Sequence, residues 1–90
     1  MKYTDMIAGE VYVGNIRQAN AKWVFLYCPR NTNKRGSDTI HHKGPSLLLG
    51  TNGKIRPEQA LYSFHESWEF SLPTPEQRAL FIKNVIYEIY

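Results

Sequence analysis

The sequence predicts an α+β fold, in which a small, curved antiparallel sheet of about five strands is closed by an amphipathic C-terminal helix. Three patterns support this prediction: an aromatic and aliphatic run over residues 22–28, an Asn52-Gly53 pair typical of hairpin turns, and helical periodicity after Thr74. A chain of 90 residues suits one hydrophobic core, and no repeat or low-complexity tract divides it. We therefore expect a single domain over residues 1–90.

The first two predicted strands are Gly9–Gly14 and Lys22–Cys28. Glycines at both ends of the first strand permit the bends of a curved sheet. Side chains of a strand alternate between its faces, so the second strand has two apolar faces, with Trp23, Phe25 and Tyr27 on one and Val24, Leu26 and Cys28 on the other. We therefore expect a central strand, which Pro29 ends because proline donates no ladder hydrogen bond.

The segment from Pro29 to Pro45 is polar and rich in turn-forming residues. It predicts a long surface loop, within which residues 39–42 are compatible with an extended strand. Loops of this length in small domains are uncommon and are usually functional or mobile. This segment is therefore the first place to look for a binding surface.

Two further strands flank the Asn52-Gly53 turn, which requires positive φ at both of its central residues. Residues 57–67 fit either a helical turn or the start of a strand, and the sequence leaves both open. The run Trp68–Leu72 alternates strictly and predicts a last strand. Its inward-facing side chains would be Trp68, Phe70 and Leu72.

The C-terminal helix has clear signals at its start and along its length. Thr74 is a suitable N-cap, Pro75 suits the first helical position, and Gln77 completes the spacing of a capping box. An apolar stripe at 3.6-residue spacing follows, made of Phe81, Ile82, Val85, Ile86 and Ile89. Polar residues lie opposite the stripe, so we expect the helix to cover one face of the sheet.

Composition and charge narrow the classes of function. The net charge is +3 and the isoelectric point is about 9.1, which favours anionic partners. Cys28 is the only cysteine, so no internal disulfide forms and a reducing cytoplasm is the expected location. No apolar stretch reaches the roughly 20 residues that span a bilayer, and the N-terminus lacks a signal core, so we expect no membrane partner and no export.

The candidate binding residues come from the polar segment and the strand before it. The segment supplies possible phosphate contacts, namely Arg30, Lys34, Arg35, His41, His42 and Lys43. The preceding strand supplies a stacking surface of Lys22, Trp23 and Tyr27 if that face is uncovered. One hypothesis is therefore a nucleic-acid-binding module. The alternative is that the cations keep a surface loop soluble while the aromatic residues belong to the core.

Metal binding and catalysis are weakly indicated. Four residues carry metal-ligand atoms, Cys28, His41, His42 and His65, but they lack the paired spacing of zinc sites. A small ribonuclease using these histidines as acid and base, with Lys43 steadying a phosphate, is a third hypothesis. The GxxG of Gly50–Gly53 matches KH domains, but a β-turn explains it better. We expect no catalytic residues, no metal and no cofactor.

Two segments resemble small bacteriophage proteins. Residues 68–78, Trp-Glu-Phe-Ser-Leu-Pro-Thr-Pro-Glu-Gln-Arg, resemble an ending in which a short strand precedes a Thr-Pro-Glu cap and a final helix, and Gly9–Val13 is similar to the opening of their SH3-like barrels. The resemblance implies a barrel-like sheet and a non-enzymatic accessory protein in the bacterial host cytoplasm, which binds and modulates or inhibits a host protein. This is the first functional hypothesis, and the tyrosine, tryptophan and arginine content suits an interaction surface.

Overall fold

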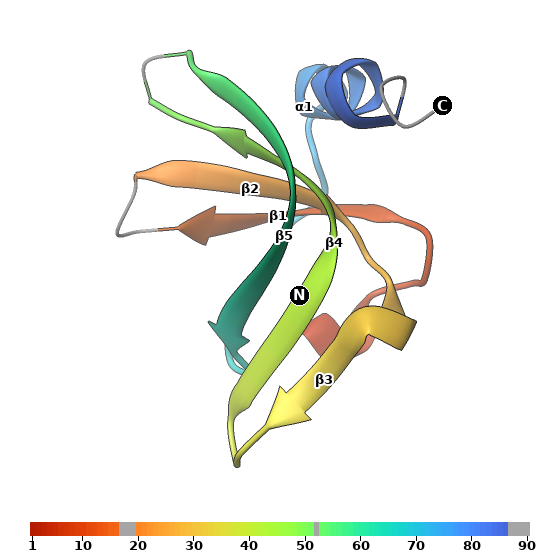
Figure 1. Ribbon diagram of the computed structural model, residues 1–90, viewed down its shortest axis with the longest axis vertical. Coiled ribbons are helices and arrows are strands. Elements are labelled where there is room, and N and C mark those ends of the chain that lie inside the picture. Colours follow the sequence, from red (N-terminus) through yellow and green to blue (C-terminus); the bar gives the residue numbers. More distant parts are fainter. Residues whose placement is uncertain (17–19, 52, 87–90) are drawn as a thin grey trace.

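A computed structural model describes the chain except for residues 17–19, 52 and 87–90 and the side chains of residues 58–62 and 86. Its elements are η1 (Tyr3–Asp5), β1 (Val11–Ile16), β2 (Ala21–Leu26), η3 (Pro29–Asn31), β3 (Thr32–Arg35), β4 (Thr39–Leu49), β5 (Ile55–His65), α1 (Pro75–Phe81) and its π-helical continuation η4 (Ile82–Ile86). The five strands form one curved antiparallel sheet, and the helix lies against one end of it (Figure 1). The predicted α+β fold is confirmed.

The long strand β4 organises the sheet. Its whole length pairs with β5 on one edge. On the other edge its first residues pair with β3 and its last residues with β2, so that β3 and β2 follow one another along β4. Between β2 and β3 the chain leaves the sheet through η3, so this part of β4 has no partner strand on that side. Pro45 lies there, and its missing N–H therefore costs the sheet no hydrogen bond.

The two faces of the sheet carry two different cores. The inner face is aromatic: Tyr12, Trp23, Phe25, Ile40 and Phe64 cluster there with Phe70, which follows β5 in the chain. The outer face is aliphatic at one end, where Val11, Val13, Val24 and Leu47 pack against Phe81 and Val85 of the helix. The predicted alternation along β2 is confirmed, and β2 is a central strand between β1 and β4. The helix therefore covers the aliphatic face and leaves the aromatic face to other segments.

The aromatic face is closed by the N-terminus and by residues 66–71. Phe70 packs into the aromatic core, and its backbone exchanges hydrogen bonds with Met1 at 2.7 Å each. Ser71 forms an isolated bridge with Val13 of β1. The expected last strand over residues 68–72 is therefore reduced to one bridge, and the inward orientation of two of its side chains is wrong: Trp68 is 36% and Leu72 67% exposed. Alternation in this segment reflects one buried anchor, Phe70.

The predicted long loop over residues 29–45 is wrong, although the extended strand considered for residues 39–42 is confirmed as part of β4. It contains a short 3-10 turn, then β3, then the first seven residues of β4, joined at a tight turn where Gly36 has φ +72°. Residues 57–67, which the sequence left open, belong mostly to β5. The β4–β5 hairpin is confirmed, but residues 50–54 connect the strands, with Gly53 at φ +79°. The predicted two-residue turn is therefore wrong, and Asn52 lies outside the described residues.

The start of the C-terminal helix is confirmed in detail. The Thr74 Oγ1 accepts from the Gln77 N–H at 3.2 Å, and the Gln77 side chain accepts from the Thr74 N–H at 2.9 Å. Of the predicted stripe, Phe81 and Val85 are buried, whereas Ile82 is 37% exposed. The side chain of Ile86 and all of Ile89 lie outside the described residues. Within the described ranges, the helix is too short and too polar to cross a bilayer.

Candidate binding surface

The outer face of β4 is divided into a covered end and a bare end. Leu47 packs under Phe81 and Val85, and Leu49 packs against the same cluster. The alternation that places these two side chains outward also places Thr39, His41 and Lys43 outward, since all five positions are odd-numbered along one regular strand. Figure 1 shows the helix at the opposite end of β4, so the described residues of the helix do not cover Thr39, His41 and Lys43.

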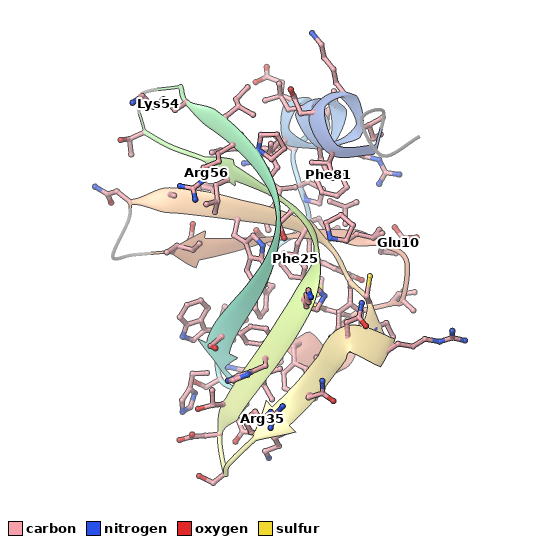
Figure 2. All side chains as sticks on the ribbon, viewed as in Figure 1. Glu10, Phe25, Arg35, Lys54, Arg56 and Phe81 are labelled. Atoms are coloured by element: carbon pink, nitrogen blue, oxygen red, sulfur yellow. The ribbon has the colours of Figure 1, made fainter. Side chains whose placement is uncertain are left out.

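We call three residues of this bare end the basic surface: the cations Arg35 and Lys43, together with His41. Arg35 belongs to β3 and lies opposite Thr39 of β4, and directly paired residues project from the same face. Arg35 and Lys43 are exposed, and His41 is half-buried. Among the described residues none of the three has an acidic partner, and Arg35 is labelled on the β3 hairpin in Figure 2.

Lys34 and Arg30 stand apart from the basic surface. Lys34 lies opposite the buried Ile40, so it projects from the other face of the sheet. There its Nζ pairs with the Glu66 carboxylate at 3.0 Å, and the hydrogen bond and charge of Glu66 raise the pKa of Lys34. Arg30 is exposed on η3. Lys34 and Arg35 are neighbours in sequence, but the strand separates them to opposite faces.

His42 is a core residue, which contradicts its expected place on a binding surface. Its side chain is 1% exposed, stacks on Tyr27 and meets the rings of Trp23 and Phe25 edge-on. Nε2 accepts the Cys28 N–H at 3.3 Å, so the neutral ring carries its proton on Nδ1, which has no hydrogen-bond partner. Burial lowers the pKa of His42 to about 4. The neutral ring satisfies a backbone donor at the gap between β2 and β3.

The expected stacking surface of Lys22, Trp23 and Tyr27 does not form. Trp23 is 1% exposed, stacks on Phe25 with ring centroids 3.9 Å apart, and donates from Nε1 to the Ser46 Oγ at 2.9 Å. Tyr27 is half-buried against the aromatic core. Lys22 is exposed at the far end of β2, where its Nζ donates to the Asn15 Oδ1. Aromatic side chains of this strand are therefore unavailable to nucleic-acid bases.

The described residues bring together no catalytic constellation. His41 and His42 project from opposite faces, and His65 pairs with Asp38 at 3.3 Å. The Cys28 thiol donates to the Leu26 carbonyl oxygen. Burial raises the pKa of this thiol, which disfavours the reactive thiolate. Within the described ranges no three histidine, cysteine, aspartate or glutamate side chains gather closely enough to hold a metal.

Comparison with known proteins adds no further assignment: no family model, curated protein or solved structure matches the chain. The surface itself must therefore carry the functional argument. The sequence analysis named all three residues of the basic surface, but it grouped them with Lys34 and His42. The alternation of β3 and β4 turns those two side chains to the other face. The Gly36 turn between two polar strands is the signal that could have separated them.

Proposed function

We propose that this protein is a non-enzymatic accessory protein of the bacteriophage type that its sequence resembles, and that it binds a host protein through the basic surface. The observation that carries the proposal is the bare end of the outer sheet face. There Arg35, His41 and Lys43 have no acidic partner among the described residues, while every other described lysine of the N-terminal half has one polar contact or more. The partner must then present an acidic surface.

A sheet is a suitable platform for such contacts. The backbone that carries Arg35 and Lys43 is already fixed by the ladders of β3 and β5 with β4. Binding therefore costs little backbone conformational entropy. Arginine offers a planar fork that pairs with a carboxylate through two hydrogen bonds, and lysine adds a compact charge. The net charge of +3 accelerates the encounter with an acidic partner.

Nucleic-acid binding is less well supported by the same surface. Binding of single strands combines phosphate contacts with bases stacked on aromatic side chains. Trp23 is buried, and no aromatic side chain among the described residues of the bare end replaces it. Two exposed cations alone would give weak, sequence-independent attraction to phosphates. A protein partner therefore fits the surface better.

The test is capture from a bacterial lysate by the tagged protein, with and without nuclease treatment, compared across two variants. We expect the parent protein to capture one discrete host protein, with or without nuclease. The double variant Arg35→Glu, Lys43→Glu should no longer capture it. The control is Lys83→Glu, an exposed lysine on the helix, which should capture as the parent does. Capture that disappears with nuclease supports the nucleic-acid module instead, and capture unaffected by the double variant removes the basic surface from the account.

A further inference from the structure

The sheet has three edge strands, β1, β3 and β5, and they differ in how well they are protected from pairing. On β1, Ser71 already bridges Val13, which occupies the middle of that edge. Among the described residues, β3 and β5 each pair with β4 alone, so each has one backbone edge without a strand beside it. Unpaired edges are templates for another strand, and natural proteins protect them with short length, charge or proline. The free edge of β3 is only four residues long and carries Lys34 and Arg35. The edge of β5 is eleven residues long.

Two hydrogen bonds fix which residues of β5 face the open edge. The Glu66 N–H donates to the Asp38 carbonyl oxygen at 2.8 Å, and the Gly50 N–H donates to the Lys54 carbonyl oxygen at 2.9 Å. The register between these bonds is continuous, so even-numbered residues of β5 bond to β4. Odd-numbered residues therefore turn their backbone N–H and C=O groups outward.

The position of Pro57 is consistent with this assignment. As an odd-numbered residue it faces the open edge, where a proline, which has no N–H, breaks no hydrogen bond to β4. It protects the first part of the edge. From residue 59 to His65 the strand contains no proline, lysine, arginine, aspartate or glutamate. At the far end, the Trp68 N–H occupies the His65 carbonyl oxygen at 3.0 Å. A neutral stretch of about seven residues is thus left without the devices that protect β3.

We propose that this stretch pairs with the same stretch of a second copy of the chain, antiparallel and about a two-fold axis near residue 62. In this register residue 61 lies opposite Ser63 of the second copy, and residue 59 lies opposite its His65. Pairs of outward-facing residues then exchange up to about six backbone hydrogen bonds. A two-fold contact uses the β5 edge in both copies. The edges that remain are the charged edge of β3 and the edge of β1 that Ser71 bridges at Val13, so the assembly closes as a dimer.

Electrostatics permit this arrangement despite the charge of each copy. Lys43 lies one strand from the edge, opposite residue 61. Two Lys43 side chains would therefore be separated by three strand spacings, about 14 Å, which exceeds the screening length of about 8 Å at physiological salt. The two-fold axis is perpendicular to the sheet, so both outer faces look the same way. The dimer would present two basic surfaces side by side, although the pairing does not depend on the function proposed for them.

The first test is the mass in solution across a concentration series, by sedimentation or light scattering. We expect a species of twice the 10.5 kDa chain mass at high concentration. Ser63→Lys places two like charges at the centre of the new pairing and should give a monomer with an unchanged circular dichroism spectrum. Asn33→Lys adds the same charge to the same face on β3 and should remain dimeric. A parent that stays monomeric, or a dimer that Ser63→Lys leaves intact, overturns the proposal.

Amide hydrogen exchange supplies a second readout that does not depend on any substitution. In the dimer the outward amides of residues 61 and 63 are bonded to the second copy, so their exchange should slow as concentration rises. Amides of even-numbered residues such as Phe64 bond to β4 and should be protected at every concentration. Exchange at residues 61 and 63 that is fast and independent of concentration would exclude pairing at this edge.

Discussion

The covered and bare ends of β4's outer face are built on one strand with one alternation of side chains, yet they differ completely in chemistry. At one end Leu47 lies under Phe81, and at the other His41 and Lys43 are without a cover. The lengths of the elements account for this difference. Residues 75–86 make a helix of about 18 Å, whereas eleven residues of strand span about 35 Å. A helix of this size covers half of the face, and the other half must be polar.

The largest expected effect is at the covered end. Phe81→Ala removes a fully buried ring from the cluster of Val11, Val13, Val24 and Leu47, and it should lower the free energy of unfolding by about 3–5 kcal/mol. Chemical denaturation measures this change. The control is Ile82→Ala, where the side chain is 37% exposed and the cost should be below about 1.5 kcal/mol. Equal costs at the two positions would mean that the helix presents a different face to the sheet.

The second effect tests the inner face through its buried imidazole. His42 is neutral in the fold with a pKa of about 4, below its ordinary value of 6.5, so on acidification the unfolded chain takes up the proton first. The contribution of neutral His42 to the free energy of unfolding is therefore fully present above pH 6.5. It is lost as the pH falls from 6.5 through 4. The shift corresponds to about 3 kcal/mol.

Unfolding free energies measured between pH 7 and pH 4 check this expectation. His42→Asn should lower stability at pH 7 and flatten the dependence on pH, because the titrating group is gone. His41→Asn, on the bare outer end, is the matched substitution and should change the stability at pH 7 by less than about 0.5 kcal/mol. A parent whose stability is constant from pH 7 to pH 4 would contradict the burial of His42.

The third effect concerns the segment that closes the inner face. Gly14 lies on β1, and a Cβ there would come within 2.9 Å of the Phe70 Cε1. Gly14→Ala should therefore displace Phe70 and cost about 1–3 kcal/mol, although alanine relieves part of glycine's entropic penalty in a strand. Thermal unfolding measures the loss. An unchanged or higher melting temperature would show that Phe70 does not pack against β1.

The smallest effect is expected at the bare end. Lys43 is exposed and has no partner among the described residues, so Lys43→Ala should change the free energy of unfolding by less than about 0.5 kcal/mol. The same denaturation series as for Phe81→Ala measures it. A loss above about 1.5 kcal/mol would mean that Lys43 supports the fold rather than a binding surface.

The elements that the sequence predicted well are those whose signals are local. The Thr74 capping box needs only three residues, and the two-faced apolar pattern of β2 already implies a central strand. The hairpin before β5 was recognised from the Asn52-Gly53 pair, although its connection is longer than expected. These features depend on backbone geometry within a few residues, so tertiary packing did not alter them.

The errors arose where polarity was taken for irregular structure. Residues 32–43 are polar because β3 and the first part of β4 have a bare outer face, and a polar strand resembles a loop in composition. Both faces of β2 are apolar, so the sequence left open whether Trp23 forms a stacking surface or belongs to the core, and the structure confirms the core. The burial of His42 on β4 was not expected, because the polar residues around it hid the alternation of that strand. Arg35, His41 and Lys43 therefore share the outer face, whereas Lys34 and His42, which were expected beside them, lie on the other face.

The most direct test of the basic surface is covalent labelling of lysine side chains in the captured complex, compared with the free protein by mass spectrometry. The account predicts that Lys43 becomes unreactive when the partner is bound, whereas Lys83 on the helix keeps its reactivity. Equal reactivity of Lys43 in the free and bound protein would contradict the assignment of the partner to the bare end of the sheet.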